Sequence, residues 1–171
     1  MRRWLLLLPL FLALLLAGCG YGLVGSKRSP LLRDIEALAI PILSNQTQEP
    51  GIESTITSSV RNAFIDDGRV AVVDEAEAQA VLRGTIREYY LEPIAFNRSD
   101  SVIRYRLHLV IQVSLFDIVE GKILLKQLLR SDREYQVGGQ VADTNRARLA
   151  ALDLAADDFA RELSSLIIEG F

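Results

Sequence analysis

The clearest hydrophobic pattern in the chain lies between residues 103 and 115, where apolar and polar side chains alternate. The odd positions are all apolar, and the even positions include Arg104, Arg106 and His108. A period of two places the apolar side chains on one face of a β-strand. We therefore predict a long strand with one buried face and one face that meets solvent or a partner.

A second strand is predicted over residues 122–137, and the turn before it determines how the two strands pair. Residues 119–121 are predicted to form a three-residue turn, with Gly121 at the position that needs a positive φ. Both core faces must point the same way, so the numbers of paired residues share parity. The resulting register makes three pairs: Arg106 with Glu134, His108 with Asp132, and Arg104 with Gln136.

Two stretches carry apolar side chains at helical spacing. The first helix is predicted over residues 50–67, where Pro50 suits the first turn. The second is predicted over residues 143–168, with Asp143 or Thr144 as its N-cap. Its apolar stripe could form a coiled-coil seam, but two helices beside about four strands favour packing on a sheet.

Shorter segments are predicted between these elements. Residues 34–43 alternate with the period of a strand, and Pro41 places that strand at a sheet edge or ends it. Residues 70–73 form a short β-branched run, and residues 74–80 are predicted to make a turn of helix.

A further strand is predicted over residues 81–91 and is expected to end before Pro93. Residues 94–101 then form a loop that carries Arg98. One face of this strand is expected to carry Arg83, Thr85, Arg87 and Tyr89.

The order of these elements predicts an α+β fold. Two helices can cover only one sheet face, so we expect a two-layer sandwich with both helices on one face of a mostly antiparallel four-stranded sheet. The other face is left to meet something else. It is expected to carry Arg104, Arg106, His108, Lys126 and Arg130, together with Val110, Phe116, Leu124 and Leu128.

The start of the chain has the pattern of an export signal. Arg2 and Arg3 precede an uncharged apolar run over residues 4–17. A membrane-spanning helix needs roughly 20 apolar residues, and this run is shorter and contains Pro9. We therefore predict a signal peptide.

Residues 16–19, Leu-Ala-Gly-Cys, resemble a bacterial lipobox. In that motif the cysteine thiol receives a diacylglycerol, the leader is cleaved just before the cysteine, and the new amine is acylated. A buried cysteine without a role is the alternative. The prediction is a signal peptide over residues 1–18, a lipidated tether over 19–33, and one domain over 34–171. Several acyl chains on Cys19 would anchor the protein stably to a membrane.

The composition of the mature chain supplies little reactive chemistry. Removal of residues 1–18 takes away Arg2 and Arg3, which leaves 153 residues with 17 basic and 22 acidic side chains. This acidic balance argues against nucleic acid as the main partner. His108 is the only histidine and Cys19 the only cysteine, so we expect no enzyme, no metal and no cofactor.

One motif suggests a dinucleotide but lies in the wrong context. Residues 20–25 match G-x-G-x-x-G, a motif that needs a strand before it and a helix after it. Here a lipidated terminus precedes it, so we predict no bound dinucleotide.

Five segments together resemble the lipopolysaccharide-assembly lipoprotein family LptE: residues 16–23, 38–45, 49–53, 80–86 and 104–107. The resemblance covers almost all of the mature chain. It implies an outer-membrane lipoprotein on the periplasmic side that plugs the β-barrel of LptD and helps to assemble it. It also implies binding of lipopolysaccharide during transport to the outer leaflet, and a fold of two helices on a four-stranded sheet.

The resemblance implies basic contacts to lipopolysaccharide before and after the long strand. Arg98 matches the first position, and Lys126 or Arg130 matches the second. Arg104 and Arg106 on the exposed face are further candidates. The phosphates of lipid A suit Arg as a bidentate donor and Lys as a point charge. Solvated strand residues without a ligand are the alternative.

Two other functions remain open from the sequence. A free-standing periplasmic lipoprotein that binds a lipid or a cell-wall ligand would need an apolar pocket between sheet and helices. Small residues favour close packing there instead: Ala39, Ala63, Gly84 and Ala156. A hydrolase would need a cluster of titratable groups, which the single histidine does not supply.

Overall fold

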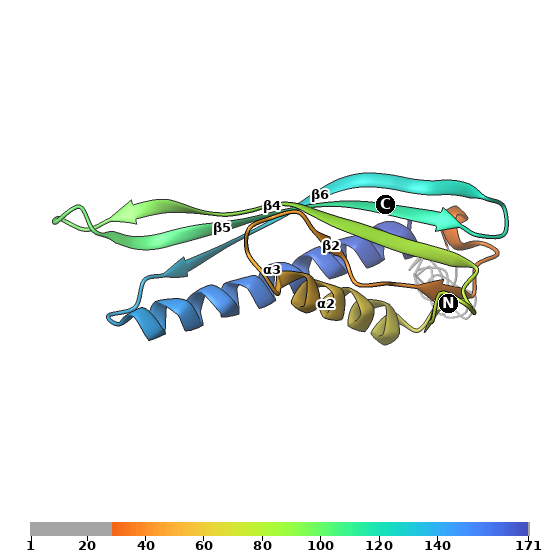
Figure 1. Ribbon diagram of the computed structural model, residues 1–171, viewed down its shortest axis with the longest axis horizontal. Coiled ribbons are helices and arrows are strands. Elements are labelled where there is room, and N and C mark those ends of the chain that lie inside the picture. Colours follow the sequence, from red (N-terminus) through yellow and green to blue (C-terminus); the bar gives the residue numbers. More distant parts are fainter. Residues whose placement is uncertain (1–28, 171) are drawn as a thin grey trace, which may run out of the picture.

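The computed structural model describes residues 29–170, which form an elongated molecule of two layers (Figure 1). Both helices lie on one face of the sheet, as predicted, and the α+β character is confirmed. The elements in chain order are η1 (Pro30–Leu32), β1 (Ala37–Ala39), β2 (Ser44–Asn45), α2 (Ile52–Asp67), β3 (Ala71–Val73), β4 (Ala80–Phe96), β5 (Val102–Asp117), β6 (Lys122–Gln136) and α3 (Val141–Ile168).

The sheet is mixed and has six strands, so the predicted number of four strands was wrong; its two long ladders are antiparallel, and short parallel pairings are added to them. Its order is β3-β1-β4-β5-β6, and β2 also pairs with β4. β1 runs parallel to both its neighbours, and β2 runs parallel to β4. β1 lies within the strand predicted over residues 34–43, whereas β2 has two residues and is too short for periodicity to reveal. β1 ends at Ala39, so Pro41 follows the strand. Since β1 has a neighbouring strand on each side, Pro41 does not mark a sheet edge.

The hairpin of β5 and β6 has the predicted register, and all three predicted pairs form. The turn differs from the prediction, because β5 ends at Asp117 and four residues, 118–121, join the strands. Gly121 has the expected positive φ, 66°. A bulge where Leu115 and Phe116 meet β6 compensates for the extra turn residue and restores the register.

β4 continues past Pro93 to Phe96, contrary to the prediction. β1 and β2 pair with β4 only as far as Ile86. Beyond that point β5 is the only described neighbour of β4, so a residue without an N–H can be tolerated at this open edge.

β4 also has a bulge, between Ile86 and Glu88, and this bulge changes which side chains of β4 share a face. The bulged residue Arg87 reverses the alternation. Tyr89 therefore lies opposite Leu109 on the core face, and the prediction that Tyr89 shares a face with Arg83 was wrong.

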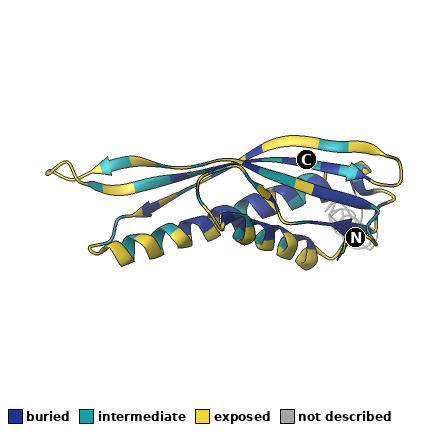
Figure 2. Ribbon diagram, viewed as in Figure 1, coloured by how far each residue is buried: buried dark blue, intermediate teal, exposed yellow. Residues whose placement is uncertain are grey.

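The core lies between the helices and the odd-numbered face of β5 (Figure 2). The five odd positions from Leu107 to Leu115 are at most 1% exposed. Close packing extends to Gly84, where an added Cβ would lie 2.7 Å from the side chain of Leu43. Leu32, inside the segment predicted as tether, is also fully buried in this core.

The helices begin and end close to the predicted positions. Residues 75–77 form a turn where one turn of helix was predicted. The N-cap of α3 is Gln140, so neither predicted residue, Asp143 or Thr144, has that role. The Thr144 hydroxyl instead accepts the N–H of Gly138 at 3.1 Å from within the first turn.

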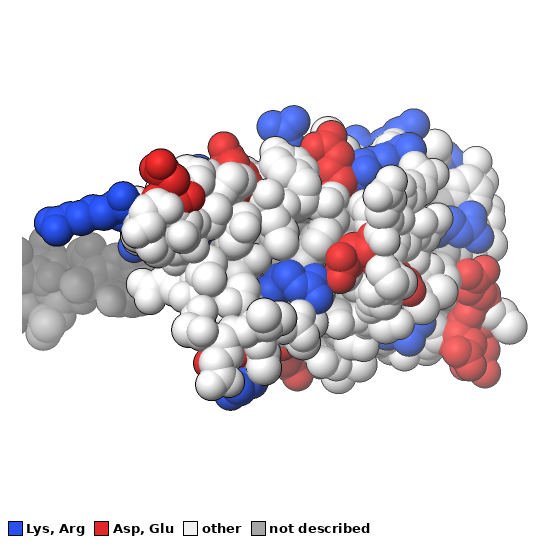
Figure 3. Space-filling view, turned by 60° about the vertical axis from the view of Figure 1, so that its left-hand side comes forward, with Lys and Arg blue, Asp and Glu red and all other residues white. Residues whose placement is uncertain are grey.

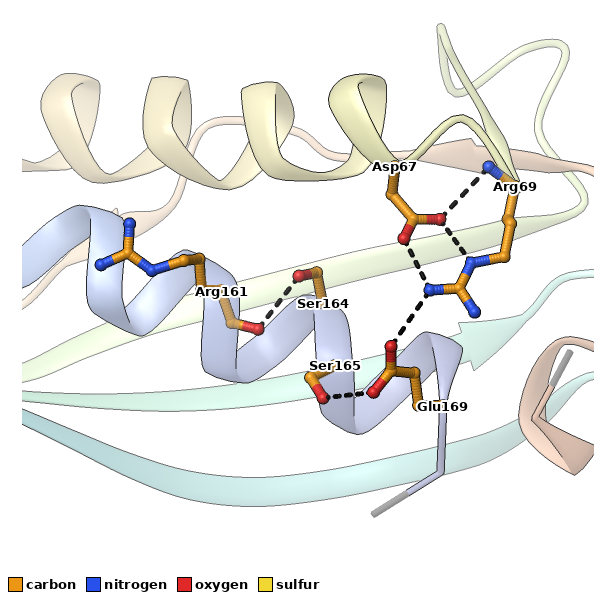
Figure 4. Close-up of polar contacts among 6 residues, drawn as sticks. All are labelled: Asp67, Arg69, Arg161, Ser164, Ser165 and Glu169. Atoms are coloured by element: carbon orange, nitrogen blue, oxygen red, sulfur yellow. Dashed lines mark hydrogen bonds and ion pairs between the residues drawn. The ribbon is translucent and has the colours of Figure 1, made fainter. Parts of the chain in front are cut away.

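Arg69 joins the C-terminal ends of the two helices (Figure 4). Its Nη2 lies 2.7 Å from Asp67 Oδ2 and 3.3 Å from Glu169 Oε1. The hydrogen bond from Arg69 is the main reason that the pKa of Asp67 is lowered. Ser29, the first described residue, lies beside this contact, because its N–H donates to the carbonyl of Ile168 at 2.9 Å. We call this end of the molecule the entry end.

Candidate functional site: the open face of the sheet

The sheet face away from the helices, here called the open face, carries the even-numbered side chains of β5. Cross-strand pairing with β4 and β6 orders the open face into rows of three residues. From the entry end these rows are Arg83, Ser114 and Lys126; Thr85, Gln112 and Leu128; Glu88, Val110 and Arg130; Tyr90, His108 and Asp132; Glu92, Arg106 and Glu134; Ala95, Arg104 and Gln136.

Two of the candidate ligand residues, Arg104 and Arg106, share one carboxylate. Arg106 Nη2 donates to Glu134 Oε1 at 2.7 Å, and Arg104 Nη1 lies 3.6 Å from Glu134 Oε2. The hydrogen bond from Arg106 is the main reason that the pKa of Glu134 is lowered. Both guanidinium groups are therefore partly neutralised within the protein.

His108 joins the three long strands. Its Nδ1 lies 2.9 Å from Asp132 Oδ1, its Nε2 lies 2.9 Å from Glu92 Oε2, and its ring stacks on Tyr90 with centroids 4.5 Å apart. A doubly protonated imidazole donates to both carboxylates, whereas the neutral ring has one N–H. With both nitrogens engaged, His108 is placed to hold strands together, and we assign it a structural role.

Lys126 lies at the other end of the open face, in the part of the sheet that also carries two arginines of β4 that were not among the ligand candidates. Arg83 and Lys126 flank Ser114 in one row, about 10 Å apart across two strand spacings. In the adjacent bulge, Arg87 donates to Gln112 Oε1 at 2.6 Å and to Gln46 Oε1 at 2.6 Å. We call Arg83, Arg87 and Lys126 the basic cluster. The basic cluster could have been found from the sequence if the pairing of β4 with β5 had been predicted.

The charges of the basic cluster are only weakly compensated. Arg83 lies 3.6 Å from Glu75, and both side chains are more than half exposed, so this pair is expected to contribute little. Within residues 29–170, Lys126 and Arg130 form no ion pair. Figure 3 shows that on the face it presents basic and acidic side chains are interspersed, so any anion site is local.

Arg98 lies at the tip of the β4–β5 hairpin, in the turn between Phe96 and Val102. The Asn97 side chain accepts the N–H groups of Ser99 and Ser101 and shapes this turn. Twelve residues of β5 separate Val102 from the row of Lys126, a distance of about 40 Å along the strand. The structure therefore does not bring Arg98 and Lys126 into one site.

A group of polar contacts, here called the junction, lies on the helix side of the sheet where β4 extends beyond the core. Arg148 Nη1 donates to Glu49 Oε1 at 2.7 Å and to Tyr89 Oη at 3.2 Å. Partial burial acts to lower the pKa of Arg148, but these two hydrogen bonds outweigh it and raise the pKa. Burial is the main reason that the pKa of Tyr89 is raised. This junction links three segments that are distant in sequence, so the sequence analysis missed it.

Two of the surface hollows among the described residues have defined linings. One is lined by η1 and the β5–β6 turn, and the other by α2, β3 and the segment after it. Neither is lined by the apolar core-face residues of β5. Within residues 29–170, no group of three or more side chains is placed to hold a metal ion, and no helix is long and apolar enough to cross a membrane.

The sequence matches the family described as Lipopolysaccharide-assembly, LptE, over residues 35–167. The chain belongs to this family. The resemblance found in its residues is thereby confirmed, and at family level an LptE chain is a lipopolysaccharide-assembly lipoprotein. A search of curated proteins finds no match. Cys19, the signal peptide and the glycine motif at 20–25 lie outside the described residues.

Solved structures share the fold of this LptE chain. A protein of Xanthomonas campestris is 14% identical with a TM-score of 0.60, over 79% of this chain and 84% of that one. A minor lipoprotein of Acinetobacter baumannii is 19% identical with a TM-score of 0.53, over 77% and 90%. PelC from Paraburkholderia phytofirmans, solved as a dodecamer, is 14% identical with a TM-score of 0.52, over 78% and 89%. Likeness at these identities concerns the fold alone.

Proposed function

We propose that this protein is an outer-membrane lipoprotein, anchored through Cys19 on the periplasmic side, that plugs the LptD β-barrel and helps it to assemble. We further propose that it binds lipopolysaccharide. Family membership supports the general role. The observation that carries the plug is the long two-layer shape with a polar open face.

The dimensions and the charges suit the lumen of a large barrel. β5 has 16 residues and is about 50 Å long, with the two layers packed about 10 Å apart. Barrels with many strands enclose a wide lumen that a plug can fill, and the lumen wall is polar. Alternating cations and carboxylates on the open face match such a wall, whereas they would be costly against hydrocarbon.

Co-purification tests the plug. The lipidated protein, tagged and extracted in a mild detergent, is expected to bring a large outer-membrane barrel protein with it. An unrelated periplasmic lipoprotein with the same tag is the control. Recovery of the protein alone would overturn the proposed plug.

We propose that the basic cluster contacts the phosphates of lipopolysaccharide, with Arg130 nearby. Arg98 would be a separate contact, because it lies about 40 Å from Lys126 along β5. Arg104 and Arg106 are weaker candidates since they share Glu134. Charge-assisted hydrogen bonds are stronger than neutral ones, so loss of one is expected to weaken binding about tenfold.

Charge reversal separates these contacts. Lys126→Glu and Arg98→Glu are each expected to weaken lipopolysaccharide binding, and the double variant to multiply the two effects because distant sites act independently. Lys126→Arg, which keeps the charge, is the control. Unchanged binding in the double variant would remove the ligand site and leave the plug untouched.

A further inference from the structure

The turn between β5 and β6 begins with two aliphatic residues, Ile118 and Val119, although turns favour Gly, Pro, Asn, Asp and Ser. Val119 is 78% exposed and Ile118 is 42% exposed. Ile123, the second residue of β6, is 60% exposed. Three aliphatic side chains therefore project from one tip of the molecule, where the fold itself does not need them.

The backbone N–H groups of this turn already have hydrogen-bond partners within the protein. The buried Asp117 carboxylate accepts the N–H groups of Val119 and Glu120, both at 2.9 Å. Ile118 N–H donates to the carbonyl of Gln79 at 2.9 Å. Unpaired backbone groups make desolvation costly. Because three successive donors are already bonded within the protein, that cost is reduced at this tip.

The turn lies at the entry end. It shares a surface hollow with η1, whose lining includes Pro30 and Leu31 from one segment and Val119 and Leu124 from the other. The described chain enters at Ser29, ten residues after Cys19. Ten residues span at most about 35 Å. Acyl groups on Cys19 would therefore keep this tip close to the lipid leaflet that holds them.

We propose that the β5–β6 turn is a second membrane contact, which inserts Ile118, Val119 and Ile123 into the headgroup region of the phospholipid leaflet that holds the anchor. The proposal rests on the proposed acylation of Cys19 for its placement. This position of the turn agrees with the proposed plug. Acyl chains on Cys19 have to reach lipid outside the barrel, which requires the entry end to lie near the barrel mouth. Glu120 and Lys122 pair with each other, so apolar burial supplies the attraction.

Tryptophan fluorescence gives a direct test, because the only tryptophan of the sequence, Trp4, lies in the predicted leader. Val119→Trp then carries a single probe at the tip, and Leu154→Trp, at a position 55% exposed on α3, is the matched control. Both chains carry a histidine tag in place of residues 1–19 and are held on vesicles by a nickel-chelating lipid. This attachment makes the result independent of acylation.

The vesicles contain zwitterionic phospholipids with brominated acyl chains. We expect the emission of the Val119→Trp chain to shift to shorter wavelength and to be quenched, and that of the Leu154→Trp chain to do neither. Absence of quenching at position 119, or equal quenching at both positions, would overturn the proposal. Flotation of the lipidated wild-type protein with vesicles tests the anchor separately.

A second pair of measurements guards against a misplaced probe. The double variant Ile118→Ser, Val119→Ser replaces the two aliphatic residues with serine, which turns accept. An unchanged urea midpoint would show that the variant is folded like the wild type. The untethered chain with these changes is expected to bind vesicles at least about tenfold more weakly than wild type. Wild-type binding is expected to persist at high salt, because apolar contacts are not screened. Binding that salt abolishes, or that the serines do not weaken, would contradict insertion.

Discussion

The two halves of β5 lie in opposite environments. Toward the entry end, its odd-numbered side chains from Leu107 to Leu115 are at most 1% exposed under the helices. Toward the hairpin tip, Ile103 on the same strand is 44% exposed, and α3 has no buried residue before Ala151 (Figure 2). We call the first half the body, and residues 92–106 with the facing residues 134–136 the arm.

Different forces hold the body and the arm. The body buries apolar side chains, which contribute roughly 1.5–3 kcal/mol each. Apart from Tyr135, which is buried and stacks on Tyr105, the arm depends on cross-strand contacts such as Arg106 with Glu134, and on His108 between Glu92 and Asp132 at its base. Exposed pairs of this kind stabilise a fold much less than a buried apolar side chain does. The arm should therefore loosen under conditions that leave the body folded.

The largest effect is expected in the body. Ile111→Ala removes a fully buried side chain and should lower the free energy of unfolding by about 2–5 kcal/mol. Leu128→Ala, at a position 50% exposed on the open face, should change it by about 0.5 kcal/mol or less. Urea unfolding measures both. Equal losses would show that the open face is also packed in the isolated protein.

An intermediate effect is expected at the junction between body and arm. Arg148→Ala leaves Glu49 and the Tyr89 hydroxyl without their hydrogen-bond donor, which should cost about 1–3 kcal/mol. Arg146→Ala, on the same helix, removes a side chain that is 78% exposed and pairs with Asp143, so little change is expected. If both variants unfold at the same urea concentration, the junction does not stabilise the fold.

The smallest effect is expected in the arm and should be local. Arg106→Ala should leave the urea midpoint almost unchanged but speed hydrogen exchange of the β6 amides near Glu134. Arg98→Ala at the hairpin tip is the control. A large fall in the urea midpoint, or exchange that changes equally in body and arm, would contradict the distinction.

The pH dependence of the arm follows from the same pair. Since Arg106 lowers the pKa of Glu134, the pair stabilises the arm fully above the usual carboxyl pKa of about 4.3. This contribution is lost as the pH falls through the lowered pKa. An NMR titration should find that the pKa of Glu134 rises toward its usual value in Arg106→Ala. An unchanged titration would mean that Arg106 does not set it.

Long alternating patterns made the β5–β6 hairpin predictable, including Arg106 opposite Glu134. Features that depend on a distant partner were not predictable. The bulge at Arg87 turns Tyr89 toward the core, and Pro93 is tolerated only because no described strand lies beyond it. The segments that contain β1 and β3 were indicated by their sequence patterns, but the parallel pairing of these two strands around α2 was not predictable.

The candidate site was predicted in part for the same reason. Lys126 and Arg130 were expected on the open face from the alternation of β6. Arg83 joins Lys126 only through the register of β4 with β5, which no local pattern specifies. The distance between Arg98 and Lys126 likewise depends on the full length of the strands.

The position of β1 inside the sheet has a consequence for the order of folding. β4 pairs with β5 and β5 with β6, so both hairpins join consecutive strands and can close quickly. β1 has to wait for residues 71–73 and 80–81 before either of its edges is paired. During export from the amino end, we therefore expect the segment next to the anchor to emerge first and to dock late, with the hairpins already formed.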